Sequence, residues 1–291
     1  MAQFKQYKKT ALLFIAPQVI ITLIFSIWPA YEALKQAFFF MDPFGLQQHF
    51  AGFSNFSHLL DNGFIQALEV TGVMAFFITL ITMGLGLMLA VLVQGRGKSQ
   101  GLYKALILWP YAVAPAVAAL LWRFLCQPNV GWLAQGFAMV GIDFNYLTHP
   151  LQALVVVIIA ASWQQLSYNF LFFFAALKLI PPSLVEAAML DGASGWRRFW
   201  QIIFPLLSPT SFFLLIMNLI YAFFDTFGII DVLTHGGPAG KTATVIYKIY
   251  QDGFINMDLG LAAAQSVIVM LMVMGLTLLQ FRYVENKVHY L

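Results

Sequence analysis

The chain has 291 residues, of which 61% are hydrophobic and only 9% carry a charge. Its mean hydropathy is +0.81. A soluble domain has about 45–50% apolar and about 25% charged residues, so this chain has too little polar surface to cover a globule in water. The composition excludes a soluble globular protein, and hydrocarbon is the expected solvent over much of the surface.

Six segments are long and apolar enough to cross about 30 Å of hydrocarbon, which takes about 20 residues each. The first segment is longer than the apolar region of a signal peptide, and the residues after it form a poor cleavage site, so it is expected to be a span. The sequence therefore predicts an all-α, polytopic membrane protein with six transmembrane helices, forming one transmembrane domain over residues 1–291. The predicted spans are 11–30, 71–94, 102–125, 151–177, 207–230 and 262–281.

The basic residues predict the orientation of these spans. With the N-terminus in the cytoplasm, 11 of the 15 Lys and Arg residues lie inside, as the positive-inside rule requires. Both termini are therefore expected in the cytoplasm, and the net charge of +3 reflects this sorting, with no indication of nucleic-acid binding. The inside residues are Lys5, Lys8, Lys9, Arg96, Lys98, Lys104, Lys178, Arg197, Arg198, Arg282 and Lys287; those outside are Lys35, Arg123, Lys241 and Lys248.

Three outside loops are substantial, at residues 31–68, 126–150 and 231–261. Within the apolar spans, Pro17, Pro110 and Pro115 each remove a backbone hydrogen bond, and each is expected to kink its helix. Kinks of this kind are common in transmembrane helices generally and sometimes shape a gated cavity.

The polar segment between the fourth and fifth spans, residues 181–209, has the pattern of a helix-turn-helix at the membrane surface. Pro181 and Pro182 are expected to end the fourth span. Ser183 and Glu186 fit a capping box that starts a short helix, and Gly192 suits the left-handed turn that ends it.

A second helical segment is expected from Ser194, with Trp196, Phe199 and Trp200 on neighbouring positions, before Pro205 closes it. One interpretation of this segment is an amphipathic loop at the lipid headgroups, with its aromatic residues in the interface. The other is a docking element for a partner protein.

A longer pattern in this segment separates the two interpretations. Glu-Ala-Ala, three residues, Gly and then a Phe-x-x-Ile-x-x-Pro-x-x-x-Pro tail resembles the EAA loop of ABC importer permeases, which docks into the groove of a partner ATPase. The pattern occurs here as Glu186, Ala187, Ala188, Gly192, Phe199, Ile202, Pro205 and Pro209. Resemblance extends over nearly the whole chain, to the carbohydrate-uptake, maltose-permease-like group and its glycerol 3-phosphate branch, at 12–17, 108–116, 121–124, 165–173, 221–227 and 236–238.

The resemblance implies the type I permease fold of ABC importers, in a bacterial inner membrane. It implies a homologous second permease, a dimer of ATPases that binds ATP and magnesium, and a periplasmic solute-binding protein as partners, besides membrane lipid. It implies glycerol 3-phosphate or a related glycerophosphodiester as the solute, with a sugar or oligosaccharide as the alternative. The implied coupling residues are Glu186, Ala187, Ala188, Asp191, Gly192, Trp196, Phe199 and Pro205.

Polar residues inside the spans are candidates for a solute pathway, because in lipid such side chains face protein or water. The alternative is hydrogen bonding between helices, which contributes only about 0.6 kcal/mol per bond on average. A phosphate group also needs cationic or amide donors, and no anion site is visible in these spans, so a partner would supply the missing charge. The pathway candidates are Gln165, Tyr168 and Asn169 on the fourth span and Asn218, Tyr221 and Asp225 on the fifth.

The sequence contains no expected site for catalysis, a metal or a cofactor. Gly236–Thr242 looks like a phosphate loop, but the position that needs the first glycine is His235. Two other classes stay open. An ion-coupled secondary carrier would need ionisable residues inside its spans, and these are nearly absent; a membrane enzyme would need clustered catalytic residues, and none appear.

Overall fold

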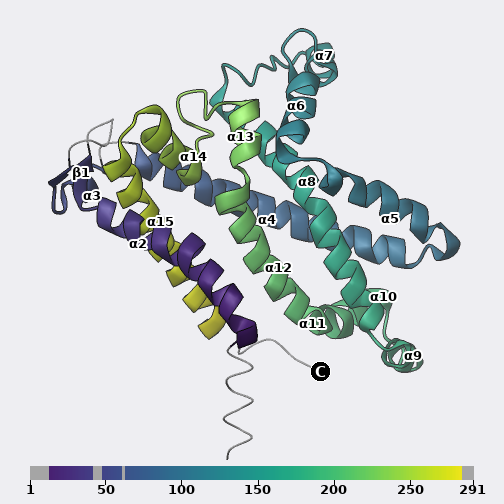
Figure 1. Ribbon diagram of the computed structural model, residues 1–291. Helices are drawn as coiled ribbons and strands as arrows, with labels where there is room; N and C mark the ends of the chain where they lie inside the picture. The colour runs from purple at the N-terminus through teal and green to yellow at the C-terminus, as the bar shows by residue number, and fades with distance from the viewer. Residues whose placement is uncertain (1–12, 42–47, 61–62, 284–291) are drawn as a thin grey trace, which may run out of the picture. The chain divides into compact units, whose positions relative to one another are not determined.

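The computed structural model describes residues 13–41, 48–60 and 63–283 (Figure 1). Among these, five helices are long and apolar enough to cross a membrane: Leu13–Gln36, α4 (Phe64–Gln94), α8 (Pro150–Leu179), Ser208–Asp225 and Leu259–Arg282. A sixth is added when the bent pair Gln100–Ala112 and Pro115–Cys126 is counted as one span. The all-α, polytopic class is confirmed. The start of the first predicted span, residues 11–12, and the predicted inside residues Lys5, Lys8, Lys9 and Lys287 lie outside the described residues.

The chain divides into two compact units. Unit 1 consists of residues 1–64 and 249–272, and unit 2 of residues 65–248 and 273–291. The single transmembrane domain over residues 1–291 stays a prediction.

Unit 1 contains the N-terminal helix and a small substructure of short elements. The helix Leu13–Gln36 runs six residues beyond its predicted end and contains a π-helical turn at Leu23–Ile27 before α2. Part of the predicted loop then forms a short antiparallel sheet, in which Phe39 lies opposite Phe50. The elements are α2 (Trp28–Gln36), β1 (Phe39–Met41), β2 (Gln48–Phe50), α3 (Ser54–Ser57), the π-helical turn Gln251–Ile255 and the start of α15 (Leu259–Tyr283).

The sheet of unit 1 is fastened by one buried amide and one glycine. Asn55 donates its side-chain N–H groups to the carbonyl oxygens of Ala37 and Phe39, both at 3.0 Å. Gly260 lies so close to Phe39 that a Cβ atom would stand 2.4 Å from the Phe39 carbonyl oxygen. The close approach explains why this position of α15 has no side chain.

Unit 2 contains most of the apolar helices. Its core clusters around α8, with Met74, Ile78, Val157 and Ile230 all fully buried. The elements are α4, α5 (Gln100–Leu108), α6 (Pro115–Cys126), α7 (Trp132–Met139), α8, α9 (Pro182–Leu190), α10 (Gly195–Arg198), α11 (Phe204–Leu206), α12 (Ser208–Ile220), α13 (Phe227–Leu233), α14 (Val245–Tyr250), the rest of α15, and the 3₁₀ turns Gly97–Ser99 and Trp109–Ala112.

The third predicted span is wrong as a continuous helix. The chain bends by 99° between Gln100–Ala112 and Pro115–Cys126 (Figure 1). Val113 and Ala114 adopt extended backbone angles. Ala114 precedes Pro115, which forces it out of the helical region, and Pro115 has no N–H to donate. Gln164 of α8 donates its side-chain N–H to the freed carbonyl oxygen of Val113 at 2.6 Å. The expected kink is thus a complete break.

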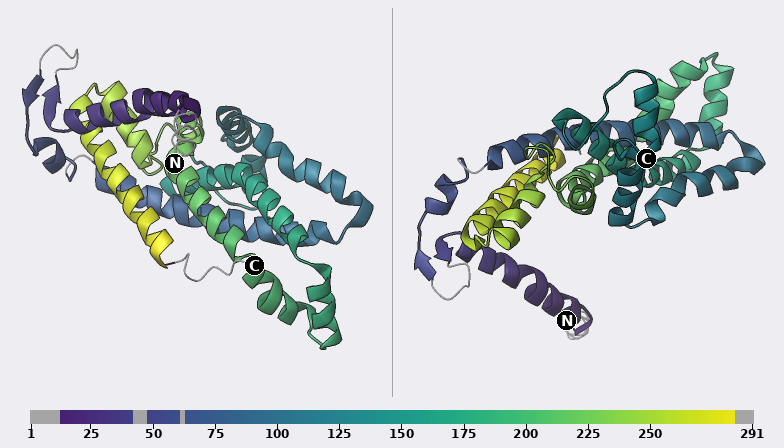
Figure 2. Two further views of the ribbon diagram at one scale, coloured as in Figure 1. Left: turned by 60° about the horizontal axis from the view of Figure 1, so that its bottom comes forward. Right: turned by 90° about the horizontal axis from the view of Figure 1, so that it is seen from above.

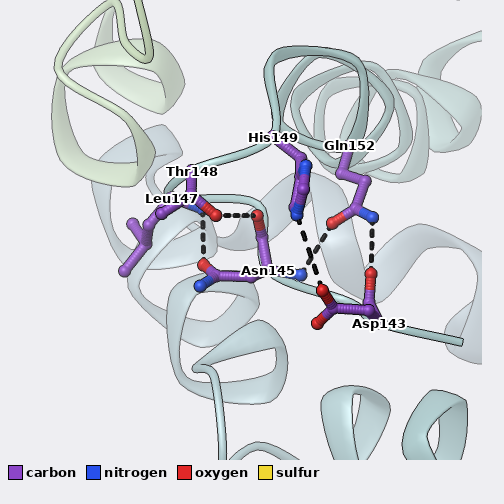
Figure 3. A network of polar contacts seen from close by, with 6 residues as sticks. All are labelled: Asp143, Asn145, Leu147, Thr148, His149 and Gln152. Atoms are coloured by element: carbon purple, nitrogen blue, oxygen red, sulfur yellow. Dashed lines mark hydrogen bonds and ion pairs between the residues drawn. The ribbon is translucent and has the colours of Figure 1, made fainter.

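The turn before α8 is held by side chains (Figure 3). Gln152 donates its Nε2 to the Asp143 carbonyl oxygen at 2.8 Å and accepts the Asn145 backbone N–H at 2.7 Å. His149 places its Nε2 3.8 Å from the Asp143 carboxylate. This network lies at the start of α8, whereas the predicted coupling loop follows its end.

Candidate coupling loop and solute cavity

The candidate coupling loop begins where α8 ends. Leu179 is the last helical residue, and Ile180 is extended because Pro181 follows it. The next helix, α9, begins at Pro182, with Pro181 at the N-cap and no capping side-chain hydrogen bond. The predicted capping box of Ser183 and Glu186 is therefore wrong: proline suits the first helical position, since its missing N–H is not needed there.

The end of α9 is a Schellman motif centred on Gly192. Gly192 has φ +76°, its N–H bonds the Met189 carbonyl oxygen at 3.1 Å, and the Ala193 N–H bonds the Ala188 carbonyl oxygen at 2.9 Å. The predicted left-handed turn at Gly192 is confirmed. The turn sends the chain back into α10, and Figure 2 (left) shows both helices beyond the ends of α8 and α12.

The second helical segment starts as predicted. Ser194 is the N-cap of α10, and its hydroxyl oxygen accepts the Arg197 N–H at 3.3 Å. Pro205, however, does not close the segment, since it lies within α11 and helical structure continues to α12 with a single break at Leu207. A π-helical turn, Phe199–Ile203, precedes Pro205, and its wider hydrogen-bonding pattern accommodates the missing proline donor.

Most of the predicted coupling residues lie on the surface. Glu186, Ala187, Asp191, Gly192 and Trp196 are exposed. Ala188 is buried, while Phe199 and Pro205 are half-buried. Large apolar side chains of the same segment are also exposed, with Leu190 90% and Trp196 75% exposed.

Glu186 also lines a groove of about 430 Å³ at this end of unit 2. The groove brings the ends of α4 and α8 together with α9 and α10, and Gln94 of α4 donates its side-chain N–H to the Leu177 carbonyl oxygen at 3.3 Å. Its lining residues are Val91, Gln94, Gly95, Leu177, Ile180, Pro182, Val185, Glu186, Met189, Arg198 and Ile203. The groove therefore lies where the loop helices α9 and α10 meet the ends of α4 and α8.

The six pathway candidates fall into two groups. Asn169 and Asn218, both fully buried, form a reciprocal amide pair: each donates to the other's side-chain oxygen, at 2.9 and 2.8 Å. Gln165 adds a third bond, donating its Nε2 to the Asn218 side-chain oxygen at 3.2 Å. The side chains of Asn169 and Asn218 thus hydrogen-bond to each other between α8 and α12.

The other four candidates line a cavity of about 510 Å³. The cavity lies beside the break between α5 and α6, so backbone and side chains of three segments meet there. Its lining residues are Tyr111, Ala112, Val113, Ala114, Pro115, Gln164, Gln165, Tyr168, Met217, Ile220, Tyr221 and Asp225. The structure thus brings Gln165, Tyr168, Tyr221 and Asp225 together.

The sequence missed the contribution of the third span to this cavity. Tyr111 and the extended residues Val113 and Ala114 form one wall, and the Tyr111 ring lies 6.0 Å from the Tyr168 ring. Prolines at positions 110 and 115 were the available signal. They indicated a disturbed helix but not which way the broken ends would face.

Comparisons with known proteins identify relatives along most of the chain. Residues 74–290 match the profile of the family described as "Binding-protein-dependent transport system inner membrane component". The chain is 50% identical over 279 residues to the sn-glycerol-3-phosphate transport system permease protein UgpA of Rhizobium meliloti (strain 1021), covering 96% of this chain and 95% of that protein. The protein of the same name from Agrobacterium fabrum is 51% identical over the same coverage.

Two solved structures have a similar fold. One is a bacterial ABC transporter involved in the import of the acidic polysaccharide alginate, with a TM-score of 0.85, 22% identity, and coverage of 98% of this chain and 99% of that chain. The other is the bacterial alginate ABC transporter in complex with an alginate pentasaccharide-bound periplasmic protein, with a TM-score of 0.83, 23% identity, and coverage of 97% and 96%. At these identities the likeness concerns the fold alone.

Proposed function

Because the chain belongs to the family of binding-protein-dependent transport system inner membrane components, we propose that it carries sn-glycerol 3-phosphate, or a related glycerophosphodiester, across the inner membrane. The chain is a multi-pass, non-catalytic permease of an ABC importer. The observation that supports this choice of solute is the 50–51% identity to UgpA permeases over nearly the full length of the chain.

The proposed partners are those the family implies. A homologous second permease would complete the pathway, two ATPase subunits would bind ATP and magnesium, and a periplasmic binding protein would deliver the solute. The proposed orientation has both termini in the cytoplasm, which places the loop between α8 and α12 on the side where ATP is available.

The proposed coupling element is the loop of residues 181–209. Its exposed apolar and aromatic side chains suit a protein groove, since an exposed cluster of large apolar residues is usually an interaction site. Closure of the ATPases would push α9, and the Schellman turn at Gly192 would transmit the movement to α10 and α12. The coupling positions are Glu186, Ala187, Ala188, Asp191, Gly192, Trp196, Phe199 and Pro205.

The proposed pathway is the cavity that Gln165, Tyr168, Tyr221 and Asp225 line. Asn169 and Asn218 would support its wall from behind. The cavity also gives weight to a second candidate solute, a sugar or oligosaccharide, because none of its lining residues is basic and a phosphate group favours cationic donors.

Uptake competition in the reconstituted complex separates the two solutes. Proteoliposomes that contain both permeases and the ATPases, supplied with the binding protein, are loaded with ATP and given labelled glycerol 3-phosphate. Unlabelled glycerol 3-phosphate is expected to suppress uptake while maltose and related sugars do not. Uptake of the sugar in place of glycerol 3-phosphate would refute the proposed solute.

A further inference from the structure

The solute cavity of this chain has an unequal supply of hydrogen-bonding groups. Three of its side-chain donors are already engaged with the protein: Gln164 Nε2 bonds the Val113 carbonyl oxygen at 2.6 Å, Gln165 Nε2 bonds the Asn218 side-chain oxygen at 3.2 Å, and the Tyr221 hydroxyl bonds the Ala161 carbonyl oxygen at 3.3 Å. The Tyr221 hydroxyl proton and one N–H of each Gln amide are therefore already bonded to the protein.

The acceptors in the same wall are mostly unused. The Gln164 side-chain oxygen has no hydrogen-bond partner within the described residues, but the atom is buried and is not open to the solute. Asp225 is exposed in the cavity and offers a carboxylate, an acceptor-only group with two oxygens. The hydroxyls of Tyr111 and Tyr168 complete the polar lining and either donate or accept.

The charge of the cavity wall also favours a solute group that donates hydrogen bonds. No Lys, Arg or His stands among the residues that line the cavity, and the single ionisable carboxyl is that of Asp225. A phosphate group presents only acceptor oxygens and negative charge. It therefore finds no cation to pair with in this cavity, and the Asp225 carboxylate repels it. A hydroxyl group of the solute can donate its proton to the Asp225 carboxylate, and the Tyr111 and Tyr168 hydroxyls can donate to it or accept from it.

We propose that this wall binds the hydroxyl end of the solute, with Asp225 accepting hydrogen bonds from the glycerol hydroxyls and the phosphate directed away, towards a surface that another subunit supplies. The inference rests on the proposed function and adds which end of the solute this chain recognises. It makes Asp225 the specificity-determining residue for the hydroxyl groups. A site built to bond a hydroxyl discriminates strongly against an analogue without it, because its own polar group is then left unpaired.

The test measures the uptake of three solutes by four forms of the reconstituted complex. The solutes are glycerol 3-phosphate, 3-hydroxypropyl phosphate, which lacks the central hydroxyl, and the methyl ester of glycerol 3-phosphate, which alters only the phosphate. The proteins are wild type, Asp225→Leu, Asp225→Glu and the control Asp143→Asn, which removes the same charge from a 91% exposed side chain outside the cavity (Figure 3). The kcat/KM of uptake is measured for each pair.

Wild type and Asp143→Asn are expected to transport glycerol 3-phosphate at least tenfold more efficiently than 3-hydroxypropyl phosphate. Asp225→Leu is expected to lose about tenfold on glycerol 3-phosphate and almost nothing on the deoxy analogue, so that discrimination falls to about twofold or less. Asp225→Glu keeps the carboxylate and restores most of the discrimination. The effect of the methyl ester relative to glycerol 3-phosphate is expected to be the same in all four proteins.

Each other outcome overturns a stated part of the reasoning. An equal loss on glycerol 3-phosphate and the deoxy analogue in Asp225→Leu, or unchanged discrimination, overturns the inference while the proposed function stands. A changed response to the methyl ester in Asp225→Leu shows that the phosphate lies at this wall and also overturns it. Failure of the wild-type complex to transport glycerol 3-phosphate overturns the proposed function and the inference with it. If Asp225→Leu does not assemble, judged by ATP hydrolysis stimulated by the binding protein, Asp225→Asn takes its place with a smaller change in the same direction.

Discussion

The buried amide pair between α8 and α12 yields a quantitative prediction about stability. Asn218 takes part in three hydrogen bonds, two with Asn169 and one with Gln165. Bonds between transmembrane helices contribute ~0.6 kcal/mol each on average and ~1.7 kcal/mol at most. Replacing Asn218 by Leu, which has nearly the same shape, therefore removes about 2 kcal/mol of stability, and the buried groups left without partners raise the cost towards about 4 kcal/mol.

The second replacement, Asn169→Leu, distinguishes the amide pair from a simple packing effect. Because the two residues bond chiefly to each other, the double variant Asn169→Leu/Asn218→Leu leaves fewer unpaired groups than either single variant. We expect it to be about 1–3 kcal/mol less destabilised than the two single effects added together. The free energy of unfolding is measured by titrating the purified permease in detergent micelles with SDS.

The control for this cycle is Gln135→Leu on α7. Gln135 is exposed and makes one long bond, 3.4 Å to the Val130 carbonyl oxygen, so its loss should change stability by less than about 0.5 kcal/mol. The reasoning would be refuted if the two single effects, added together, equalled the effect of the double variant within about 0.3 kcal/mol. The two amides would then contribute to stability independently.

Three further substitutions test the packing and the coupling loop. Gly86→Ala puts a Cβ atom 2.8 Å from the Asn169 Cβ and is expected to lower the free energy of unfolding by about 1–3 kcal/mol. Gly84→Ala, whose Cβ atom meets nothing within 4 Å, is the matched control, and equal effects of the two substitutions would contradict the close helix approach. In Gly192→Ala the new Cβ atom meets no neighbour either, but the φ of +76° at this position should lower the free energy of unfolding by about 1 kcal/mol. The same SDS titration measures this change, and an unchanged free energy of unfolding would refute the predicted strain. Glu186→Lys is expected to abolish ATP-driven uptake without lowering the unfolding free energy, and intact uptake would count against the docking role.

The sequence predicted the spans better than it predicted their interruptions. Apolar length alone located α4, α8 and α15 to within a few residues at most ends, because about 20 apolar residues have few alternatives in lipid. The 99° break at Val113 and Ala114 was not predicted, since a proline in a span produces anything from a slight kink to a full break. The difference here is Gln164, which satisfies the released Val113 carbonyl oxygen from another helix.

The polar residues of the spans show a similar limit. The sequence predicted Asn218, Tyr221 and Asp225 alike as pathway candidates, but only Tyr221 and Asp225 belong to the π-helical turn Tyr221–Asp225. Asn218 lies in α12 before this turn and pairs with Asn169, while Tyr221 and Asp225 line the cavity. Which polar residue bonds a helix and which faces a cavity depends on the neighbouring helices, and the sequence of one helix does not contain that information.

The irregular backbone segments of unit 2 coincide with the cavity that is proposed as the solute pathway. Backbone outside regular helices is tolerated at membrane depth only where it is buried in protein or lines a cavity that holds water. Two such segments of unit 2, the break at Val113–Ala114 and the π-helical turn Tyr221–Asp225, contribute residues to the same cavity. They come from different spans more than 100 positions apart in the sequence, so their convergence is not a consequence of chain proximity. At the break, the Val113 carbonyl oxygen accepts from Gln164 at 2.6 Å and the Ala114 carbonyl oxygen accepts from the Ala118 N–H at 2.9 Å. The break is therefore stable beside the cavity because other parts of the protein satisfy its carbonyl groups.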